Sequence, residues 1–160
     1  MMERFSTDEE QQKIQLLFVC TGNTCRSPMA ELVCADMTGT DNVKSVSAGL
    51  YAFDGDAMSE NSLAVLAESG IDGNSFRSRP LSFDLVRESS LILTMTAAHR
   101  AELLMRYPDA AGKCFTLLEK SGGGDVSDPF GQNIAVYRHT LGEIRRGIAG
   151  WIEFFNNFYK

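Results

Sequence analysis

The sequence has little of what membrane proteins, secreted proteins and nucleic-acid binders need. No apolar run reaches the roughly 20 residues of a membrane-spanning helix. Residues 1–13 are polar and lack the apolar segment of a secretory signal. The 15 basic residues are outnumbered by 21 acidic ones, and this net charge of −6 argues against binding nucleic acids or anionic membranes. We therefore expect a cytoplasmic, monomeric protein that binds neither nucleic acid nor membrane.

Cysteine and histidine are also scarce. The four cysteines stand at positions 20, 25, 34 and 114, and in a reducing cytosol structural disulfides are disfavoured. His99 and His139 lie far apart and complete no known metal-binding spacing with Cys20 and Cys25. We therefore expect no metal and no cofactor. We also expect His99 to lie at the start of a surface helix, which argues against a Cys–His protease.

The length and the order of apolar patterns indicate one α/β domain. With 160 residues, 44% of them apolar, the chain can bury a substantial core. We expect a polar extension at 1–13 and a domain at 14–160. Strand patterns fall at 14–19, 43–48, 91–95 and 114–118, and helix patterns at 28–38, 58–69, 97–107 and 134–158. This alternation predicts a three-layer sandwich, a four-stranded parallel sheet with helices on both faces.

The loop after the first strand is the candidate site, because ligands in such folds bind at the carboxyl ends of the strands. A Cys and an Arg six positions apart are weak evidence alone, but here they follow an apolar strand and open a helix. Backbone N–H groups in such a turn form an anion-binding nest, and the planar guanidinium of Arg26 can close it. The residues of this loop are Cys20, Thr21, Gly22, Asn23, Thr24, Cys25, Arg26 and Ser27.

Cys20 is the candidate nucleophile of this loop. A helix N-terminus and a guanidinium favour the thiolate, which is the form that attacks phosphorus. Ser27 has two predicted roles, and both can hold. It can donate a hydrogen bond to the sulfur of Cys20, and it can cap the helix that follows, with Pro28 as the first helical residue.

A partner acid is predicted in the longest irregular stretch, residues 119–132 (EKSGGGDVSDPFGQ). An attacking thiolate needs an acid to protonate the leaving atom, and Asp128 is the best candidate if this loop folds over the first. Pro129 would stiffen the backbone, and Phe130 would form a pocket wall. Asp125 is the alternative acid.

Several segments together resemble the low-molecular-weight protein tyrosine phosphatase family. VCTGNTCRSPMAE resembles its phosphate-binding loop and GDVSDPFG its acid loop, while SAG at 47–49 and RSRPL at 77–81 match further segments in order. The resemblance spans about residues 14–158. It implies Cys20 as nucleophile, Arg26 as phosphate ligand and Asp128 as acid and base, with Asn23 and Ser27 holding the loop. It also implies a phosphocysteine intermediate and a phosphorylated protein or peptide as substrate.

A finer resemblance concerns the substrate. Thr24, together with Asp-Pro-Phe and Gly131, resembles the bacterial branch of protein arginine phosphatases, whereas tyrosine-directed members often carry isoleucine in place of Thr24. We therefore favour phosphoarginine slightly over phosphotyrosine, with Thr24 and Phe130 in the substrate pocket. One departure is Phe76, where relatives often have a histidine that supports the loop.

Other interpretations remain open at this stage. By the same resemblance Cys25 is either a redox partner that forms a disulfide with Cys20 or a small buried residue. Cys34 and Cys114 are expected in the core. An arsenate reductase shares the fold and loop, but it needs more cysteines than the single Cys114 in the second half of this chain. A non-catalytic phosphate-binding module needs neither a thiolate nor an acid.

Overall fold

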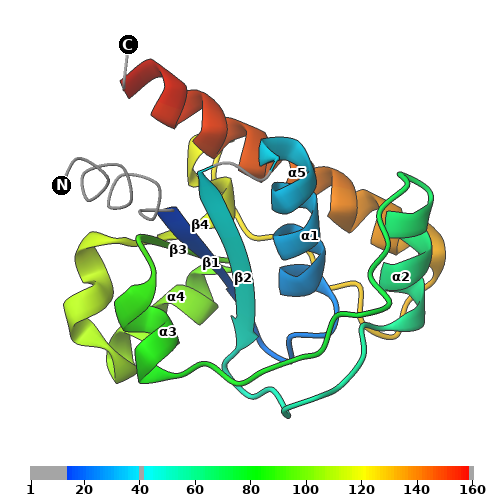
Figure 1. The fold of residues 1–160 in the computed structure, drawn as a ribbon, viewed down its shortest axis with the longest axis horizontal. Coiled ribbons are helices and arrows are strands. Elements are labelled where there is room, and N and C mark those ends of the chain that lie inside the picture. Colours follow the sequence, from blue (N-terminus) through cyan, green and yellow to red (C-terminus); the bar gives the residue numbers. More distant parts are fainter. Residues whose placement is uncertain (1–13, 40–41, 159–160) are drawn as a thin grey trace, which may run out of the picture.

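The computed structural model describes residues 14–39 and 42–158 (Figure 1), so the predicted extension at 1–13 lies outside the described residues. Four parallel strands form a sheet in the order β2-β1-β3-β4. They are β1 (Ile14–Cys20), β2 (Val43–Gly49), β3 (Leu91–Thr94) and β4 (Cys114–Thr116). This sheet confirms the predicted α/β class, and it brings the carboxyl ends of β1 and β2 side by side.

Helices cover both faces of the sheet (Figure 1). On one face pack α1 (Arg26–Thr38) and α5 (Ile134–Phe158), with α2 (Glu60–Ala67) against α5. On the other pack α3 (Phe83–Glu88), α4 (Ala97–Arg106) and the 3-10 turn η2 (Pro108–Gly112). The central strand β1 alternates between the two cores: Phe18 belongs to the first and Leu17 and Val19 to the second. This two-sided burial explains its continuous apolar run.

Element boundaries differ from the predictions mainly near the site. Helix α5 has the predicted bounds, but α1 begins at Arg26, two residues before the predicted start at Pro28. Ser27 therefore lies inside the helix, and its predicted role as N-cap is wrong. Strand β4 ends at Thr116 because the next residues form the 3-10 turn η3 (Leu117–Lys120). The short helix α3, which begins after Ser82, was not predicted.

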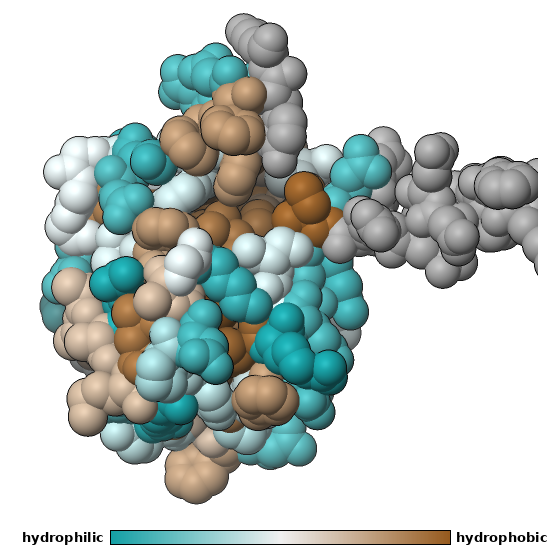
Figure 2. All heavy atoms as spheres, turned by 90° about the vertical axis from the view of Figure 1, so that its left-hand side faces the viewer, coloured by the Kyte–Doolittle hydropathy of each residue, from teal (hydrophilic) through white to brown (hydrophobic). Residues whose placement is uncertain are grey.

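The face that carries α3 and α4 is a mosaic of hydrophilic and hydrophobic side chains (Figure 2). Phe83 and Met105 are among the large apolar residues exposed there. Among the described residues, no helix combines the length and apolar character that crossing a membrane would need.

Candidate active site

The loop between β1 and α1 is closed by the segments around it. The carbonyl oxygen of Cys20 accepts from the Leu50 amide at 2.9 Å, that of Thr21 from Tyr51 at 2.9 Å, and that of Thr24 from Ser59 at 2.9 Å. With these carbonyls turned outward, the peptide N–H groups on the other side of the loop are available to an anion.

Gly49, at the end of β2, permits this close packing. A Cβ atom at this position would lie 2.6 Å from the carbonyl oxygen of Thr21 and 3.0 Å from the amide nitrogen of Asn23. Any side chain would therefore push the loop away from the sheet. The glycine of the SAG segment is required because the loop backbone rests directly on it.

Asn23 is the centre of the hydrogen bonds that hold the loop. Its backbone has φ 56°, in the left-handed region that asparagine tolerates better than most residues. The side-chain amide nitrogen donates to Ser27 Oγ at 2.8 Å and to Ser47 Oγ at 3.0 Å, and the amide oxygen accepts from the Arg79 backbone at 2.9 Å. Asn23 thus ties α1, β2 and the segment after α2 to the loop.

These bonds fix the direction of the hydroxyl group of Ser27. Cys20 Sγ lies 2.8 Å from Ser27 Oγ. Because the oxygen of Ser27 already accepts from Asn23, its own proton is free to point at the sulfur, which stabilises a thiolate. The predicted contact between Ser27 and Cys20 is therefore present, and it takes the place of helix capping.

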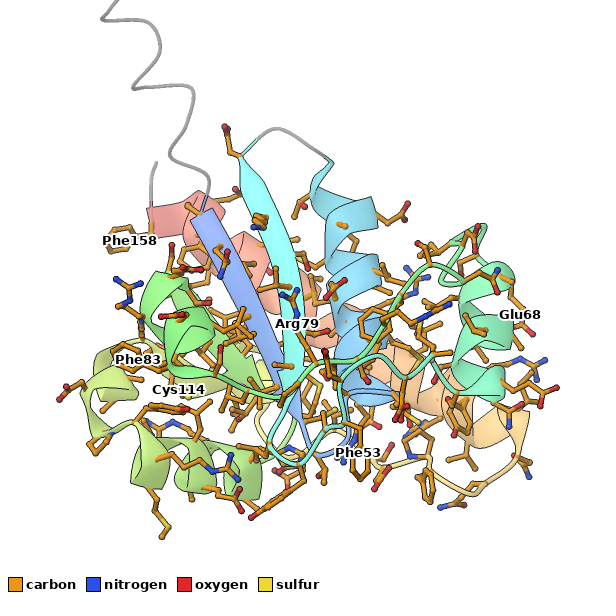
Figure 3. All side chains as sticks on the ribbon, turned by 60° about the horizontal axis from the view of Figure 1, so that its bottom comes forward. Phe53, Glu68, Arg79, Phe83, Cys114 and Phe158 are labelled. Carbon is orange, nitrogen blue, oxygen red and sulfur yellow. The ribbon has the colours of Figure 1, made fainter. Side chains whose placement is uncertain are left out.

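The hydrogen-bond chain continues to residues that were not predicted. Ser47 Oγ donates to Glu31 Oε1 at 2.9 Å, and Arg79 Nε donates to the carbonyl oxygen of Ser47 at 3.1 Å. Figure 3 shows Arg79 beside β2. Burial raises the pKa of Glu31, while the Ser47 hydroxyl and the charge of Arg79 oppose that rise. Phe76, at the position where relatives often have a histidine, packs in the apolar core.

Arg26 links this loop to the Asp-Pro loop from the far end of the chain. Its side chain is only 8% exposed, and its Nη2 lies 3.5 Å from Asp128 Oδ2. Its Nη1 donates to the carbonyl oxygen of Val126 at 3.4 Å. The guanidinium is therefore held in position before any substrate arrives.

A cavity of about 270 Å³ lies between the two loops. Asp128 faces it with a side chain that is 57% exposed, and Phe130 stands at its rim, 75% exposed. Asp125 does not line it, because its Oδ1 accepts from the Ala97 amide at 2.9 Å. The lining residues are Cys20, Thr21, Gly22, Asn23, Thr24, Cys25, Arg26, Asp128 and Phe130. All the predicted site residues except Ser27, which lies behind Cys20, therefore meet at this cavity.

His99 lies at the start of α4, as predicted, but its side chain faces inward and contacts the site. His99 is 7% exposed, and its Nε2 lies 2.9 Å from Thr21 Oγ1. Its Nδ1 is buried and has no hydrogen-bond partner among the described residues. Because a buried unpaired N–H is rarer than an unpaired acceptor, we infer that Nε2 carries the proton and donates it to Thr21. The sequence pattern places His99 early in a helix but does not indicate which neighbouring loop its side chain contacts.

Cys25 lies under the cavity in a small polar cluster. Its thiol donates to Ser59 Oγ at 3.3 Å, and its sulfur lies 3.6 Å from Tyr137 Oη. Burial raises the pKa of Tyr137, and its contact with Cys25 raises it further. Cys20 and Cys25 are both free thiols, so the predicted disulfide between them stays a prediction.

Comparison with known proteins agrees with this geometry. Residues 15–157 match the low molecular weight phosphotyrosine protein phosphatase family. A protein-arginine-phosphatase of Geobacillus stearothermophilus is 39% identical over 132 residues, which cover 81% of this chain and 88% of that protein. The low molecular weight protein-tyrosine-phosphatase PtpB of Staphylococcus haemolyticus is 40% identical over 132 residues, covering 82% and 92%.

Solved structures show the same likeness. The YwlE arginine phosphatase from Geobacillus stearothermophilus superposes with a TM-score of 0.84 at 38% identity, covering 90% of this chain and 94% of that one. A low molecular weight protein tyrosine phosphatase from T. tengcongensis gives 0.83 at 38% identity, covering 88% and 99%. The chain therefore belongs to the low molecular weight phosphotyrosine protein phosphatase family, and it is a cysteine-dependent protein phosphatase.

The environment of His99 predicts a pH dependence of stability. Burial, and then the charge of Arg26, lower the pKa of His99 from 6.5 to about 4. The unfolded chain therefore takes up this proton at a higher pH than the folded chain, so stability is full above pH 6.5 and is lost as the pH falls toward 4. In His99→Gln the free energy of unfolding should decrease less between pH 6.5 and 4 than in the wild-type protein. Urea denaturation at several pH values measures this difference.

The second histidine provides the control. The side chain of His139 is 68% exposed, so His139→Gln should keep the wild-type slope. If all three proteins lose stability equally between pH 6.5 and 4, the buried imidazole does not carry the effect.

Proposed function

We propose that this phosphatase hydrolyses phosphorylated protein side chains through a phosphocysteine intermediate, with Cys20 as nucleophile, Arg26 as phosphate ligand and Asp128 as acid and base. The observation that carries the proposal is the shared cavity, which these three residues line together. The 2.8 Å contact of Cys20 Sγ with Ser27 Oγ supports a thiolate at its floor.

In the first step the thiolate of Cys20 attacks phosphorus. The S–P bond forms while the bond to the leaving nitrogen or oxygen breaks, and protonated Asp128 gives its proton to that leaving atom. Arg26 and the backbone N–H groups of the loop hold the phosphoryl oxygens. The Ser27 hydroxyl group donates a hydrogen bond to the sulfur throughout and stabilises the thiolate that leaves in the second step.

In the second step the carboxylate of Asp128 takes a proton from water. The oxygen of that water attacks phosphorus, the S–P bond breaks, and phosphate leaves with Cys20 restored as thiolate. Asp128 fits this double role better than Asp125, because the carboxylate of Asp125 is bonded to the amino-terminal end of α4 and lies outside the cavity lining.

We favour phosphoarginine as the substrate and keep phosphotyrosine as the alternative. Thr24 offers a small wall with a hydroxyl group, which suits a planar polar guanidinium better than a branched aliphatic side chain would. The relatives include both an arginine phosphatase and tyrosine phosphatases at nearly equal identity, so the choice depends on residues at the rim such as Thr24 and Phe130.

Two other hypotheses from the sequence have weaker support. An arsenate reductase needs reactive cysteines that relay electrons, but burial raises the pKa of both Cys34 and Cys114 to about 11. Cys114 also lies on the α3 and α4 side of the sheet (Figure 3). A reversible disulfide between Cys20 and Cys25 stays a proposal, supported by the position of both thiols at one cavity.

Cys20→Ser should abolish turnover while vanadate still binds, because the loop and Arg26 remain and only the nucleophile is lost. Hydrolysis of p-nitrophenyl phosphate and vanadate titration measure the two properties. Cys114→Ala is the matched control, since it removes a buried thiol that does not line the cavity, and it should keep its turnover. Wild-type turnover in Cys20→Ser would remove the proposed mechanism.

Asp128→Ala should slow turnover by about 10²–10⁴-fold for poor leaving groups, the usual contribution of a general acid, and much less for good ones. Rates for phenyl phosphate and p-nitrophenyl phosphate measure the difference. Asp125→Ala is the comparison, and a larger loss there than in Asp128→Ala would mean that the acid is Asp125.

Thr24→Ile should shift the preference from phosphoarginine toward phosphotyrosine by about 10-fold or more, since pocket contacts of this size change specificity by ~1–3 kcal/mol. The measurement is kcat/KM on matched peptides that differ only in the phosphorylated residue. If the wild-type protein already prefers the phosphotyrosine peptide, phosphoarginine is the wrong substrate.

A further inference from the structure

Glu143 is a buried carboxylate outside the cavity. It lies on the inward face of α5, beside the buried residues Thr140, Ile144 and Gly147, and its side chain is 12% exposed. Its Oε1 accepts from the backbone amide of Ser127 at 3.2 Å and from the Ser127 hydroxyl group. The nearest basic side chain in the described part of the chain is His139, whose Nε2 lies 3.5 Å from the same oxygen.

Stability alone does not account for this residue. A carboxylate loses water on burial, and a well-packed apolar side chain of similar size at such a position is often neutral or stabilising. The rest of this helix face is largely apolar, with Leu141, Ile144 and Ile148 in the core. The presence of a buried carboxylate at position 143 is therefore best explained by the hydrogen bonds that it accepts from Ser127.

That group is the backbone immediately before Asp128. Three consecutive residues of the Asp-Pro loop are each tied to a different element. Asp125 Oδ1 accepts from the amino-terminal end of α4 at 2.9 Å. The amide of Val126 donates to the carbonyl oxygen of Met95, just after β3, at 2.9 Å. Ser127 is bonded through its amide and hydroxyl to α5.

Thr140 completes the attachment to α5. Its Oγ1 lies 2.9 Å from Ser127 Oγ and donates to the carbonyl oxygen of Ser127 at 3.3 Å. Glu143 and Thr140 together satisfy the amide, the hydroxyl and the carbonyl of Ser127. The peptide that leads into Asp128 therefore has a fixed orientation, although the side chain of Asp128 is itself 57% exposed.

We propose that Glu143 is a positioning residue for the proton transfer by Asp128, and that it acts through Ser127. The inference rests on the proposed role of Asp128 as general acid. Proton donation requires the acid to lie within hydrogen-bond distance of the leaving atom. Without Glu143, the amide and hydroxyl of Ser127 lose their acceptor and the loop loses its attachment to α5. Glu143 makes no bond to the phosphate-binding loop, and Val126, which accepts from Arg26, keeps its own bond to Met95. The phosphate-binding loop should therefore keep its geometry.

The test is a double-mutant comparison on two aryl phosphates with a good and a poor leaving group, p-nitrophenyl and phenyl phosphate. Glu143→Ala should lower kcat for phenyl phosphate by about 10-fold or more, a loss within the contribution that a general acid makes to the rate. It should lower kcat for p-nitrophenyl phosphate much less. In the Asp128→Ala background the same substitution should change either rate by less than about twofold, because the group it positions is gone. Vanadate affinity should stay at the wild-type value.

Two further variants and one control keep the test decisive. Glu143→Gln retains an oxygen that accepts from Ser127, so it should lose less activity than Glu143→Ala. Ser127→Ala removes the hydroxyl but not the amide, and it replaces Glu143→Ala in the comparison if that variant does not fold in a thermal scan. Glu153→Gln, an exposed carboxylate on the same helix, is the matched control and should behave as wild type.

The outcomes separate this inference from the proposed function. If Asp128→Ala alone leaves phenyl phosphate hydrolysis unchanged, the acid is misassigned and the inference falls with it. Suppose that Asp128→Ala hydrolyses phenyl phosphate slowly, but Glu143→Ala lowers the rate by the same factor in the wild-type protein and in Asp128→Ala. Then Glu143 does not act through Asp128, and only the inference is overturned. If Glu143→Ala hydrolyses phenyl phosphate at the wild-type rate, the inference is likewise overturned and the proposed function is not.

Discussion

The site depends first on the side chain of Asn23, because it holds a backbone turn that would otherwise be strained. A φ of 56° is unfavourable for most residues, and here it is held by three side-chain hydrogen bonds to Ser27, Ser47 and the backbone of Arg79. One amide group thus sets the curvature of the phosphate-binding loop, attaches the loop to β2, and orients the Ser27 hydroxyl group that faces Cys20. The parallel sheet matters to function because it supplies these partners from segments far apart in the sequence.

The second requirement is attraction of an anion by a protein with a net charge of −6. The bulk surface repels a phosphorylated substrate, so the attraction must be local. In the proposed mechanism Arg26 provides it from a buried position, where the guanidinium contacts Val126 and Asp128. On this proposal, an incoming phosphoryl group replaces the carboxylate of Asp128 as the partner of a guanidinium that is already in place. Once released from Arg26, Asp128 can take up from solvent the proton that it donates in the first step.

The sequence predicted the parts of the site that are contiguous. The loop from Cys20 to Ser27 and the Asp-Pro dipeptide are local patterns, and the apolar stripe of α5 gave its bounds correctly. Polar residues that reach the site from elsewhere were missed. His99 and Glu143 each occupy an ordinary helical position, and periodicity does not distinguish a polar residue in water from one buried against another loop. Ser27 was predicted both to bond to Cys20 and to cap the helix, because serine often caps helices. The helix begins one residue before Ser27, and the Ser27 hydroxyl group accepts from Asn23 and faces Cys20.

The choice between phosphoarginine and phosphotyrosine bears on how accurately Asp128 must be held. In the proposed mechanism Cys20 and Arg26 act on the phosphoryl group, which is the same in both substrates. Discrimination between the two must then arise at the leaving side. A guanidinium holds its proton more tightly than a phenol does, because the reference pKa of the guanidinium is the higher of the two. Leaving without a proton is therefore harder for arginine than for tyrosine. An enzyme for phosphoarginine gains more from a rigid acid loop, and the attachment of Asp125, Val126 and Ser127 to three separate elements supplies that rigidity next to the cavity wall formed by Thr24.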